Sequence, residues 1–416
     1  MKRPVYINDF SLRCILGSDE AQVLDSLTNG KRGTFTTYDV AGVMRPAATI
    51  DPATLAPVPE QKFDNRVNRL SQAAFSAIEN TIRKAVEKFG ADRVGIFLGS
   101  CDNGSEASMA ALKYFKETGA FPEGYVLDYQ RADFPAQFIA QRFGITGMLS
   151  VHSTACASSA SAFVSARNNL YASNCDVAIV GGVDIASLSV ILGFASLEAM
   201  SDKPTNPFSA NRSGLSLGDA AVFFVVTKEP CADLCTAKCE GLKIVGFGES
   251  ADADHITAPR ADGEGAYQAM KAALNDAGLD ASQIGYVNLH GTGTELNDAM
   301  ESRAINRLFG EASHADVPVS STKALTGHTL GAAGALELAF CCLAMNSRRE
   351  SDACKNSSEK DYLLPAHLFD GVVDPNLPPV HLVKPGETAK DLKYCMSNSF
   401  AFGGCNVSLI VENGLA

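Results

Sequence analysis

Short apolar runs, each bounded by glycine or polar residues, alternate along this chain with longer amphipathic stretches. The runs have the length and continuity of buried strands, and the clearest are Arg93–Gly99, Asp176–Val180, Ile284–Leu289, Val317–Ser320 and Leu392–Met396. Amphipathic spacing predicts helices between them, over Asn68–Phe89 and Ala266–Ala277. Strands that alternate with helices predict an α/β fold with a largely buried sheet.

The order of these elements repeats weakly in the two halves of the chain. In the first half, a strand over Gly147–Val151 leads to Cys156 and then to a helix made of small residues. In the second half, the strand Val317–Ser320 leads into a similar small-residue helix that includes Glu337. A duplication would place the two helices back to back, because small side chains permit close approach. We place the boundary near Pro230–Gly248, with one half at residues 1–240 and the other at 241–416.

Composition and charge narrow the class of protein. The 416 residues are 46% hydrophobic and 20% charged, which is typical of a large soluble globular protein. No apolar run at the start suits a signal peptide and none reaches membrane-spanning length, so we expect no membrane insertion. Twelve cysteines without a secretory signal favour free thiols in the cytoplasm. The net charge of −12 argues against nucleic acid as a partner.

Two further features have an ordinary structural interpretation beside a functional one. Cys231, Cys235 and Cys239 are spaced to form one stripe on a helix. With no histidine nearby, we interpret the stripe as a packed small-residue face and expect no metal site. The polar segment at residues 347–360 is interpreted as a tolerated surface insertion, with a regulatory or partner role left open.

Cys156 is the strongest candidate for chemistry. The predicted strand ends just before it and the small-residue helix begins just after it. The free N–H groups and the dipole at a helix N-terminus favour a thiolate, which is the reactive form of cysteine. A buried cysteine packed as a small hydrophobic residue is the alternative.

Four other motifs accompany this cysteine. His290 follows a strand and precedes Gly-Thr-Gly-Thr, and His328 lies at a second strand-to-helix turn that begins at Lys323. The paired glycines of Asn398–Asn406 let backbone N–H groups point at a ligand. Asn206–Ala220 predicts a structured loop that enters a strand. Because open α/β sheets form their sites at the carboxyl ends of strands, we expect the thiol and both histidines to converge.

With these motifs the chain resembles the β-ketoacyl-[acyl-carrier-protein] synthases of the elongating type, which are condensing enzymes of the thiolase fold. The resemblance runs from Val23–Gly30 to Asn406. It is most specific in Thr154–Ser158, in His290–Thr294, in Lys323–Gly334 and in Ser397–Gly404. It implies a five-layered αβαβα arrangement built from two βαβαβ halves.

The resemblance also implies a role for each candidate residue. Cys156 would carry the acyl chain, while His290 and His328 would act on a malonyl thioester as it loses CO2. Lys323 and Glu337 would support the histidines. The N–H groups of Cys156 and Phe402 would form the oxyanion hole, within a gate that includes Phe400 and Ala401. Thr292 and Thr294 would contact the pantetheine arm.

Acyl carrier protein is the partner that this family implies, and no cofactor is expected beyond its phosphopantetheine. Arg66 and Arg69 lie three residues apart, on one face of the predicted helix. They are candidates for contact with the acidic carrier, with a solvated helix start as the alternative. We expect a homodimer through the strand before Cys156, and a heterodimer stays open.

The chain departs from the family pattern at three positions near the site. Ala401 replaces the usual glycine of the gate, Leu215 stands where phenylalanine is common, and Cys405 replaces a usual threonine. A Cβ at position 401 restricts the backbone, which predicts a stiffer gate. These differences leave the acyl chain length and the pathway open.

Fatty-acid-type elongation by a 3-oxoacyl-[acyl-carrier-protein] synthase is the favoured function, and three alternatives remain. An iterative ketosynthase for a polyketide or polyene would use the same residues. A thiolase would place a second catalytic cysteine before its glycines, whereas Cys405 follows them here. A non-catalytic chain-length factor would lose the nucleophile that Cys156 provides.

Overall fold

The computed structural model describes residues 3–102, 104–349 and 360–416. Its main sheet has eleven strands, ten of which form two sets of five with the same internal order. From its outer edge inward, the first set is β5 (Leu149–His152), β4 (Val94–Gly99), β6 (Val177–Asp184), β8 (Ala220–Thr227) and β1 (Val5–Cys14). The second is β11 (Pro318–Ser320), β10 (Tyr286–Asn288), β16 (Tyr394–Phe400), β17 (Cys405–Asn413) and β9 (Leu242–Ala251).

Strand directions repeat as well. In each set the outer three strands run parallel to one another, and each of the inner two strands is antiparallel to both of its neighbours. The two sets join where β1 pairs with β9. The short strand β14 (His381–Leu382) pairs with β11 at the far edge. The predicted duplication is therefore confirmed, and the boundary proposed at 240/241 falls between β8 and β9.

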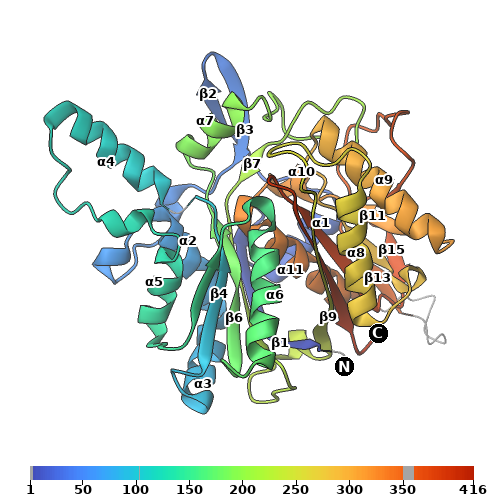
Figure 1. Cartoon of the computed structure of the whole chain (residues 1–416), viewed down its shortest axis with the longest axis horizontal. Helices are drawn as coiled ribbons and strands as arrows, with labels where there is room; N and C mark the ends of the chain where they lie inside the picture. The colour runs from blue at the N-terminus through green and yellow to red at the C-terminus, as the bar shows by residue number, and fades with distance from the viewer. Residues whose placement is uncertain (1–2, 103, 350–359) are drawn as a thin grey trace.

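Helices cover both faces of each half, which gives the expected five layers (Figure 1). The central layer is α6 (Ser158–Tyr171) and α11 (Ala333–Asn346). The first outer layer is α2 (Arg66–Phe75), α3 (Glu79–Phe89) and α5 (Phe134–Phe143), and the second is α8 (Glu264–Ala277) and α9 (Glu295–Glu311). Successive side chains of β8 point to opposite faces of the sheet and so show the layers directly. Val222 and Phe224 pack toward the central helices, while Ala221 and Phe223 pack toward α2 and α5.

The two central helices meet through small residues. A Cβ added to Gly334 of α11 would lie 2.9 Å from the Cβ of Ala160 in α6, so glycine is required at this contact. Because Cys156 lies just before α6 and His328 just before α11, this contact brings the two halves of the site together.

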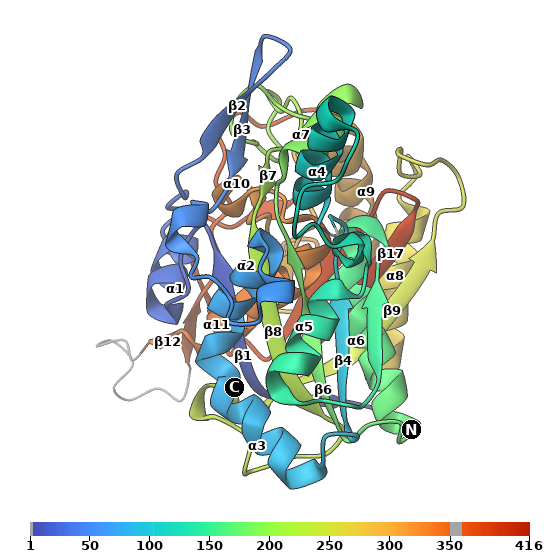
Figure 2. The same ribbon diagram turned by 90° about the vertical axis from the view of Figure 1, so that its left-hand side faces the viewer.

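The remaining elements lie around this core. A small sheet contains β2 (Thr36–Val40), β3 (Val43–Ala48) and β7 (Leu217–Gly218), and a second contains β12 (Arg348–Arg349), β13 (Asp361–Leu363) and β15 (Thr388–Lys390). The other helices are α1 (Glu20–Thr28), α4 (Ser105–Thr118), α7 (Leu188–Ser196) and α10 (Lys323–Thr326), with α4 projecting from one side (Figures 1 and 2). Across the described residues, no helix is long and apolar enough to cross a membrane.

Two local predictions require correction, and a third falls largely outside the described residues. The single helix expected over Asn68–Phe89 is two helices, α2 and α3, separated by a 3-10 turn at Ser76–Ile78. The cysteines at 231, 235 and 239 do not share a helix, because their segment folds as turns and a short 3-10 helix at Ala237–Cys239. The polar segment begins with the buried Ser347 and strand β12, and its residues 350–359 lie outside the described part.

Candidate active site

A strained turn presents Cys156 at the start of α6. Strand β5 ends at His152, Ala155 adopts a left-handed φ of 48°, and a 3-10 turn at Ala155–Ala157 leads into the helix. The second half repeats this turn at Leu330, whose φ is 53°, before α11. Non-glycine residues in this region are uncommon and are often found at functional sites.

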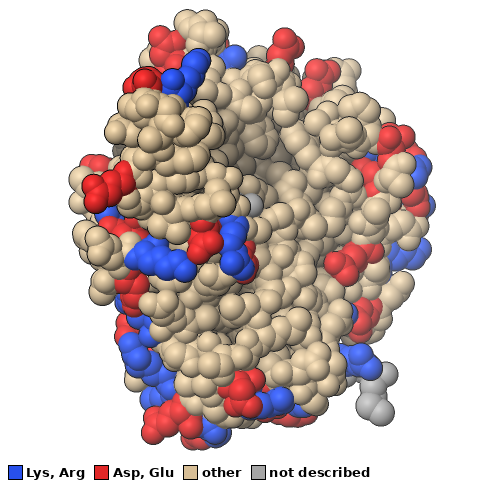
Figure 3. All heavy atoms as spheres, turned by 60° about the vertical axis from the view of Figure 1, so that its left-hand side comes forward, with Lys and Arg blue, Asp and Glu red and all other residues tan. Residues whose placement is uncertain are grey.

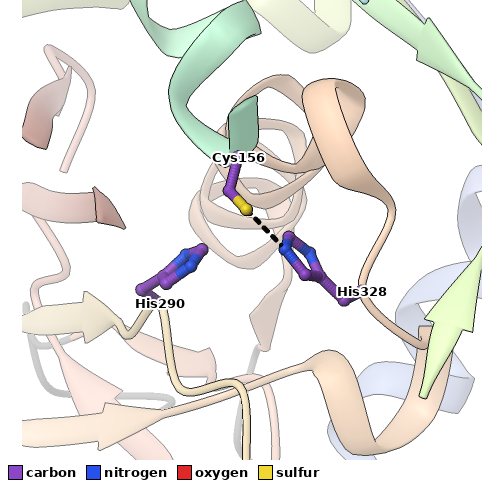
Figure 4. A group of neighbouring side chains, drawn as sticks. All are labelled: Cys156, His290 and His328. Atoms are coloured by element: carbon purple, nitrogen blue, oxygen red, sulfur yellow. Dashed lines mark hydrogen bonds between the residues drawn. The ribbon is translucent and has the colours of Figure 1, made fainter. Parts of the chain in front are cut away.

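The thiol and the two histidines converge, as predicted (Figure 4). The Sγ atom of Cys156 is 2.8 Å from Nε2 of His328. The rings of His290 and His328 meet edge to face with their centroids 5.4 Å apart. One ligand-type atom from each of the three residues lies within 4.8 Å of the others. All three side chains are buried.

A buried ion pair lies behind His290. The ammonium of Lys323, at the start of α10, donates to a carboxylate oxygen of Glu337 in α11. The same ammonium donates to the His290 carbonyl oxygen at 2.5 Å and lies 3.4 Å from its Nδ1. A neutral ring whose Nδ1 faces an ammonium carries its hydrogen on Nε2, which makes His290 a hydrogen-bond donor at the other edge.

Burial controls the protonation of this cluster. It lowers the pKa of His290 and His328 well below the usual range, and the Lys323 ammonium lowers both further. Burial also raises the pKa of Cys156 to about 11. The Lys323 ammonium and hydrogen bonds from the backbone N–H groups of Phe402 and Cys156 oppose that rise. At neutral pH the site therefore holds two neutral imidazoles and a protonated thiol.

Glu301 of α9 is a buried acid that the sequence analysis missed. Its carboxylate oxygens accept the N–H groups of His290 and Gly291, each at 2.7 Å. Burial raises the pKa of Glu301 to about 8. The available signal was its position on the apolar face of α9, in line with Ala304 and Ile305.

The predicted gate forms the loop between β16 and β17. Phe400 is buried with its ring at an edge angle to His290, and Phe402 stacks on Phe194 of α7. Gly403 and Gly404 take left-handed φ angles of 85° and 76°, which explains the paired glycines. Ala401 has no left-handed φ, so its side chain is compatible with the conformation seen here.

A cavity of about 380 Å³ opens onto the thiol. Its lining includes Cys156, both histidines, the gate residues and the two threonines predicted to contact pantetheine. The hydroxyls of Thr292 and Thr294 lie 2.9 Å apart. Leu215 also lines the cavity, where its smaller side chain leaves more room than phenylalanine would.

Arg66 and Arg69 share the start of α2 but are engaged within the chain. The Arg66 side chain is only 13% exposed and donates to Asp219 at 2.5 Å. Arg69 donates twice to Asp64, at 2.6 Å each. The predicted contact of these arginines with a carrier protein is not tested by this arrangement.

Among the described residues, the one group of three or more potential metal ligands is Cys156 with the two histidines. The cysteines at 231, 235 and 239 do not form such a group. The eleven cysteines in the described ranges are all free thiols. Neither Cys405 nor any other of these thiols joins the Cys156 cluster.

The fold is that of the thiolase-like condensing enzymes, and the site brings a buried cysteine thiol together with two histidines. The chain belongs to the β-ketoacyl synthase family. The model of the N-terminal domain of this family matches residues 19–232 and that of the C-terminal domain matches residues 242–350.

Proteins similar to this chain in sequence or structure are named as 3-oxoacyl-[acyl-carrier-protein] synthases or ketosynthases. The chain is 30% identical over 363 residues to 3-oxoacyl-[acyl-carrier-protein] synthase 2 of Staphylococcus aureus, covering 85% of this chain and 86% of that one. It is 36% identical over 294 residues to a mitochondrial protein of Schizosaccharomyces pombe described as a putative 3-oxoacyl-[acyl-carrier-protein] synthase, covering 68% and 66%. A solved ketosynthase (ApeO), in complex with its chain length factor (ApeC) from Xenorhabdus doucetiae, has a TM-score of 0.86 and 34% identity. That match covers 99% of this chain and 98% of that one.

Proposed function

We propose that this chain is a 3-oxoacyl-[acyl-carrier-protein] synthase, which joins an acyl group on Cys156 to a malonyl thioester with loss of CO2. One observation carries the proposal: a buried thiol is hydrogen-bonded to one neutral imidazole, while a second imidazole is held as a donor by Lys323. Acyl transfer needs the first arrangement and decarboxylation needs the second.

In the first half-reaction, the sulfur of Cys156 attacks the carbonyl carbon of an acyl thioester. His328 accepts the thiol proton through Nε2 and returns it to the departing carrier thiol. The backbone N–H groups of Cys156 and Phe402, which already contact the sulfur, stabilise the tetrahedral oxyanion. The products are acyl-Cys156 and free carrier thiol.

In the second half-reaction, a malonyl thioester occupies the cavity with its carbonyl oxygen between the histidines. Breaking its C–C bond releases CO2 and leaves an enolate, whose negative oxygen accepts a hydrogen bond from Nε2–H of His290. His328, whose Nε2 is the proton acceptor in the first half-reaction, donates to the same oxygen once its ring hydrogen has moved from Nδ1 to Nε2. A neutral imidazole serves this step because it donates a hydrogen bond without fully protonating the carbanion.

Condensation completes the cycle. The enolate carbon attacks the acyl-Cys156 carbonyl, the new C–C bond forms, and the C–S bond to Cys156 breaks. The resulting thiolate takes up one proton from solvent, the one proton that the whole cycle consumes, and restores the starting thiol. Lys323 and Glu337 remain in place throughout and hold His290 in its donor form.

Thr292 and Thr294 lie where an arm entering the cavity would pass them, so we assign their hydroxyls to the amide groups of pantetheine. The acyl carrier protein that bears this arm would be the macromolecular partner. No other cofactor enters the proposed chemistry.

We also propose a dimer through the outer edge of the first half. Strand β5 ends the main sheet with an unpaired edge, and Met148 and Leu149 are 40% and 36% exposed there. Large apolar side chains are also exposed nearby, at Met109, Leu112, Phe115, Leu127, Leu188 and Leu192. In Figure 3 uncharged residues cover the centre of the face, and a row of Lys, Arg, Asp and Glu side chains lies to the left of it. An apolar face with an open strand edge suits a permanent partner.

A second candidate is an iterative ketosynthase that works beside an unlike chain. The observation in its favour is the similarity to the ketosynthase that was solved with its chain length factor. The same apolar face would then pair with a different subunit. Co-purification of an unlike chain would favour this candidate.

The test is condensation by the purified protein, supplied with malonyl-carrier protein and a panel of acyl-carrier primers. Mass spectrometry should detect carrier products extended by two carbons, and the preferred primers would define the acyl pocket. A protein that instead cleaves or forms acetoacetyl-CoA from CoA thioesters would be a thiolase, contrary to the proposal.

A further inference from the structure

His328 is held through its backbone by a segment from the other half of the chain. Its N–H donates to the carbonyl oxygen of Ser216 at 2.7 Å, and its carbonyl oxygen accepts the N–H of Gly218 at 2.9 Å. These two bonds form an isolated parallel bridge between Leu217 and His328. The position of the imidazole therefore depends on where the Ser216–Gly218 segment lies.

The backbones of these two segments are so close that no side chain fits between them at Gly218 or Gly327. A Cβ on Gly327 would lie 2.3 Å from the carbonyl oxygen of Leu217, and a Cβ on Gly218 would lie 2.2 Å from that of Thr326. The two backbones thus pack directly against each other. A displacement of residues 216–218 would be passed to His328 because no flexible side chain lies between them.

Asp219, the next residue, fixes this segment to two other loops. Its side chain is fully buried, and its carboxylate accepts the N–H of Ala186 at 2.7 Å and that of Ile50 at 2.8 Å. Ala186 follows β6 and Ile50 follows β3. A single carboxylate thus ties together three segments that are distant in sequence.

Arg66 supplies the charge that this carboxylate needs. Its guanidinium donates to Asp219 at 2.5 Å and also reaches the Ile50 carbonyl oxygen at 3.4 Å. Burial raises the pKa of Asp219, and the Arg66 charge is the main factor that opposes this. Removing the cation from a buried carboxylate would destabilise the folded protein, so we treat the two residues as a unit.

We infer that Arg66 and Asp219 are positioning residues for His328, holding the Ser216–Gly218 segment so that Nε2 stays in contact with the Cys156 thiol. The inference rests on the proposed function for its catalytic meaning. It assigns Arg66 to this internal task in place of the predicted contact with a carrier protein.

The experiment measures the alkylation rate of Cys156 by iodoacetamide as a function of pH, which requires no substrate and no carrier. Asp219→Asn and Arg66→Met should slow alkylation at pH 8 about tenfold, because a misplaced base accepts the proton poorly. Arg66→Lys keeps the charge and should recover part of the rate. Cys156→Ala gives the background from other thiols.

Glu60→Gln is the matched control. Arg142 and Glu60 form a similar half-buried pair with two bonds of 2.6 Å, and neither residue lines the cavity of the site. This variant should lose comparable stability yet keep the wild-type alkylation profile.

The inference would be overturned if Asp219→Asn and Arg66→Met both alkylate at the rate of Glu60→Gln. It would also be overturned if Arg66→Met and Arg66→Lys raise only the KM for carrier-linked substrates, since Arg66 would then meet the carrier. Where Asp219→Asn does not fold, the two Arg66 variants decide the question. A protein that shows the alkylation effect but no condensation would contradict the proposed function and leave the inference intact.

Discussion

At Cys156, burial and hydrogen bonding act on the thiol in opposite directions. Burial disfavours the thiolate, while Lys323 and two backbone N–H groups favour it. The balance leaves a protonated thiol whose sulfur lies 2.8 Å from Nε2 of His328. We expect such a thiol to react slowly with small oxidants and alkylating reagents, and to react faster where His328 is placed to take its proton.

Replacing Cys156 with alanine should abolish both condensation and covalent labelling by cerulenin, because no other thiol in the described residues joins the histidines. Intact-protein mass spectrometry measures the label. Cys101→Ala is the control, since this neighbouring thiol bonds to the Ala155 carbonyl oxygen and should not be needed. Full condensation by Cys156→Ala would contradict the assignment.

Lys323→Met should raise the pKa of Cys156 further above its ordinary value, because burial would then act without the nearby ammonium. Alkylation of a thiol rises with pH up to its pKa, so the variant should react more slowly at pH 8, about tenfold for each unit of the rise. Lys323→Met combined with Glu337→Gln avoids an unpaired buried acid. Lys88→Met, at an exposed pair with Asp233, should leave the profile unchanged; an equal shift in both variants would contradict the role of Lys323.

Residue patterns and the family resemblance predicted the reacting groups and the supporting pair Lys323 and Glu337, but they did not predict the roles of Glu301 and Asp219. Cys156, His290 and His328 lie in short motifs at strand ends, so local sequence is enough to find them. Glu301 and Asp219 accept hydrogen bonds from the backbone N–H groups of His290 and Ala186, which lie elsewhere in the sequence. The apolar face of α9 marks Glu301 as buried, but it does not show which groups the carboxylate binds. The charge of Arg66 is visible in the sequence, but its partner Asp219 lies 153 residues away along the chain.

Among the elements, the gate loop between β16 and β17 departs from the family pattern at Ala401. Its backbone is pinned on both sides, since the Ala401 N–H donates to the Cys405 carbonyl oxygen and the Ala401 carbonyl oxygen accepts the Gly404 N–H. Alanine restricts the open forms of the loop more than glycine would. The loop should therefore open less often than a glycine-containing one.

Ala401→Gly should speed hydrogen exchange at residues 400–404 and change the relative turnover of long and short acyl primers. It should also lower the free energy of unfolding by about 0.5–1 kcal/mol, because glycine gains entropy in the unfolded chain. Ala312→Gly, at the end of α9, is the control for this entropy. Unchanged exchange in the gate would show that Ala401 does not stiffen it.

The periodicity of apolar residues predicts where helices and strands lie, but it does not predict where a helix is broken by a turn. The pattern over Asn68–Phe89 suits one helix, yet the chain bends at Ser76–Ile78, where Phe75 and Ile78 both enter the core. Packing against the sheet decides that bend, and amphipathic spacing alone cannot show it.

At the scale of the whole molecule, the duplicated halves explain why the site forms at the centre. Each half supplies a strained turn before a buried small-residue helix, and the two helices meet where Gly334 contacts Ala160. The sequence predicted this duplication because both halves kept the small residues. It could not predict the exposed apolar face, since that face is assembled from separate segments.

Leu112→Glu should weaken the proposed dimer, because it places a charge in the apolar face of α4, where Leu112 is 47% exposed. Light scattering at micromolar concentration measures the mass. The adjacent, exposed Lys113 offers a matched control, and Lys113→Glu should leave the mass unchanged. A wild-type chain that is monomeric, without any co-purifying partner, would contradict the proposal.

The most direct test of the account separates the two half-reactions. His290→Ala is incubated with an acyl-carrier protein and then with malonyl-carrier protein, and the intact protein and the carrier products are weighed by mass spectrometry. We expect Cys156 to gain the acyl group, while CO2 release and elongation are lost. A variant that gains no acyl group, or one that elongates at the wild-type rate, would contradict the assignment of acyl transfer to Cys156 and of malonyl decarboxylation to His290.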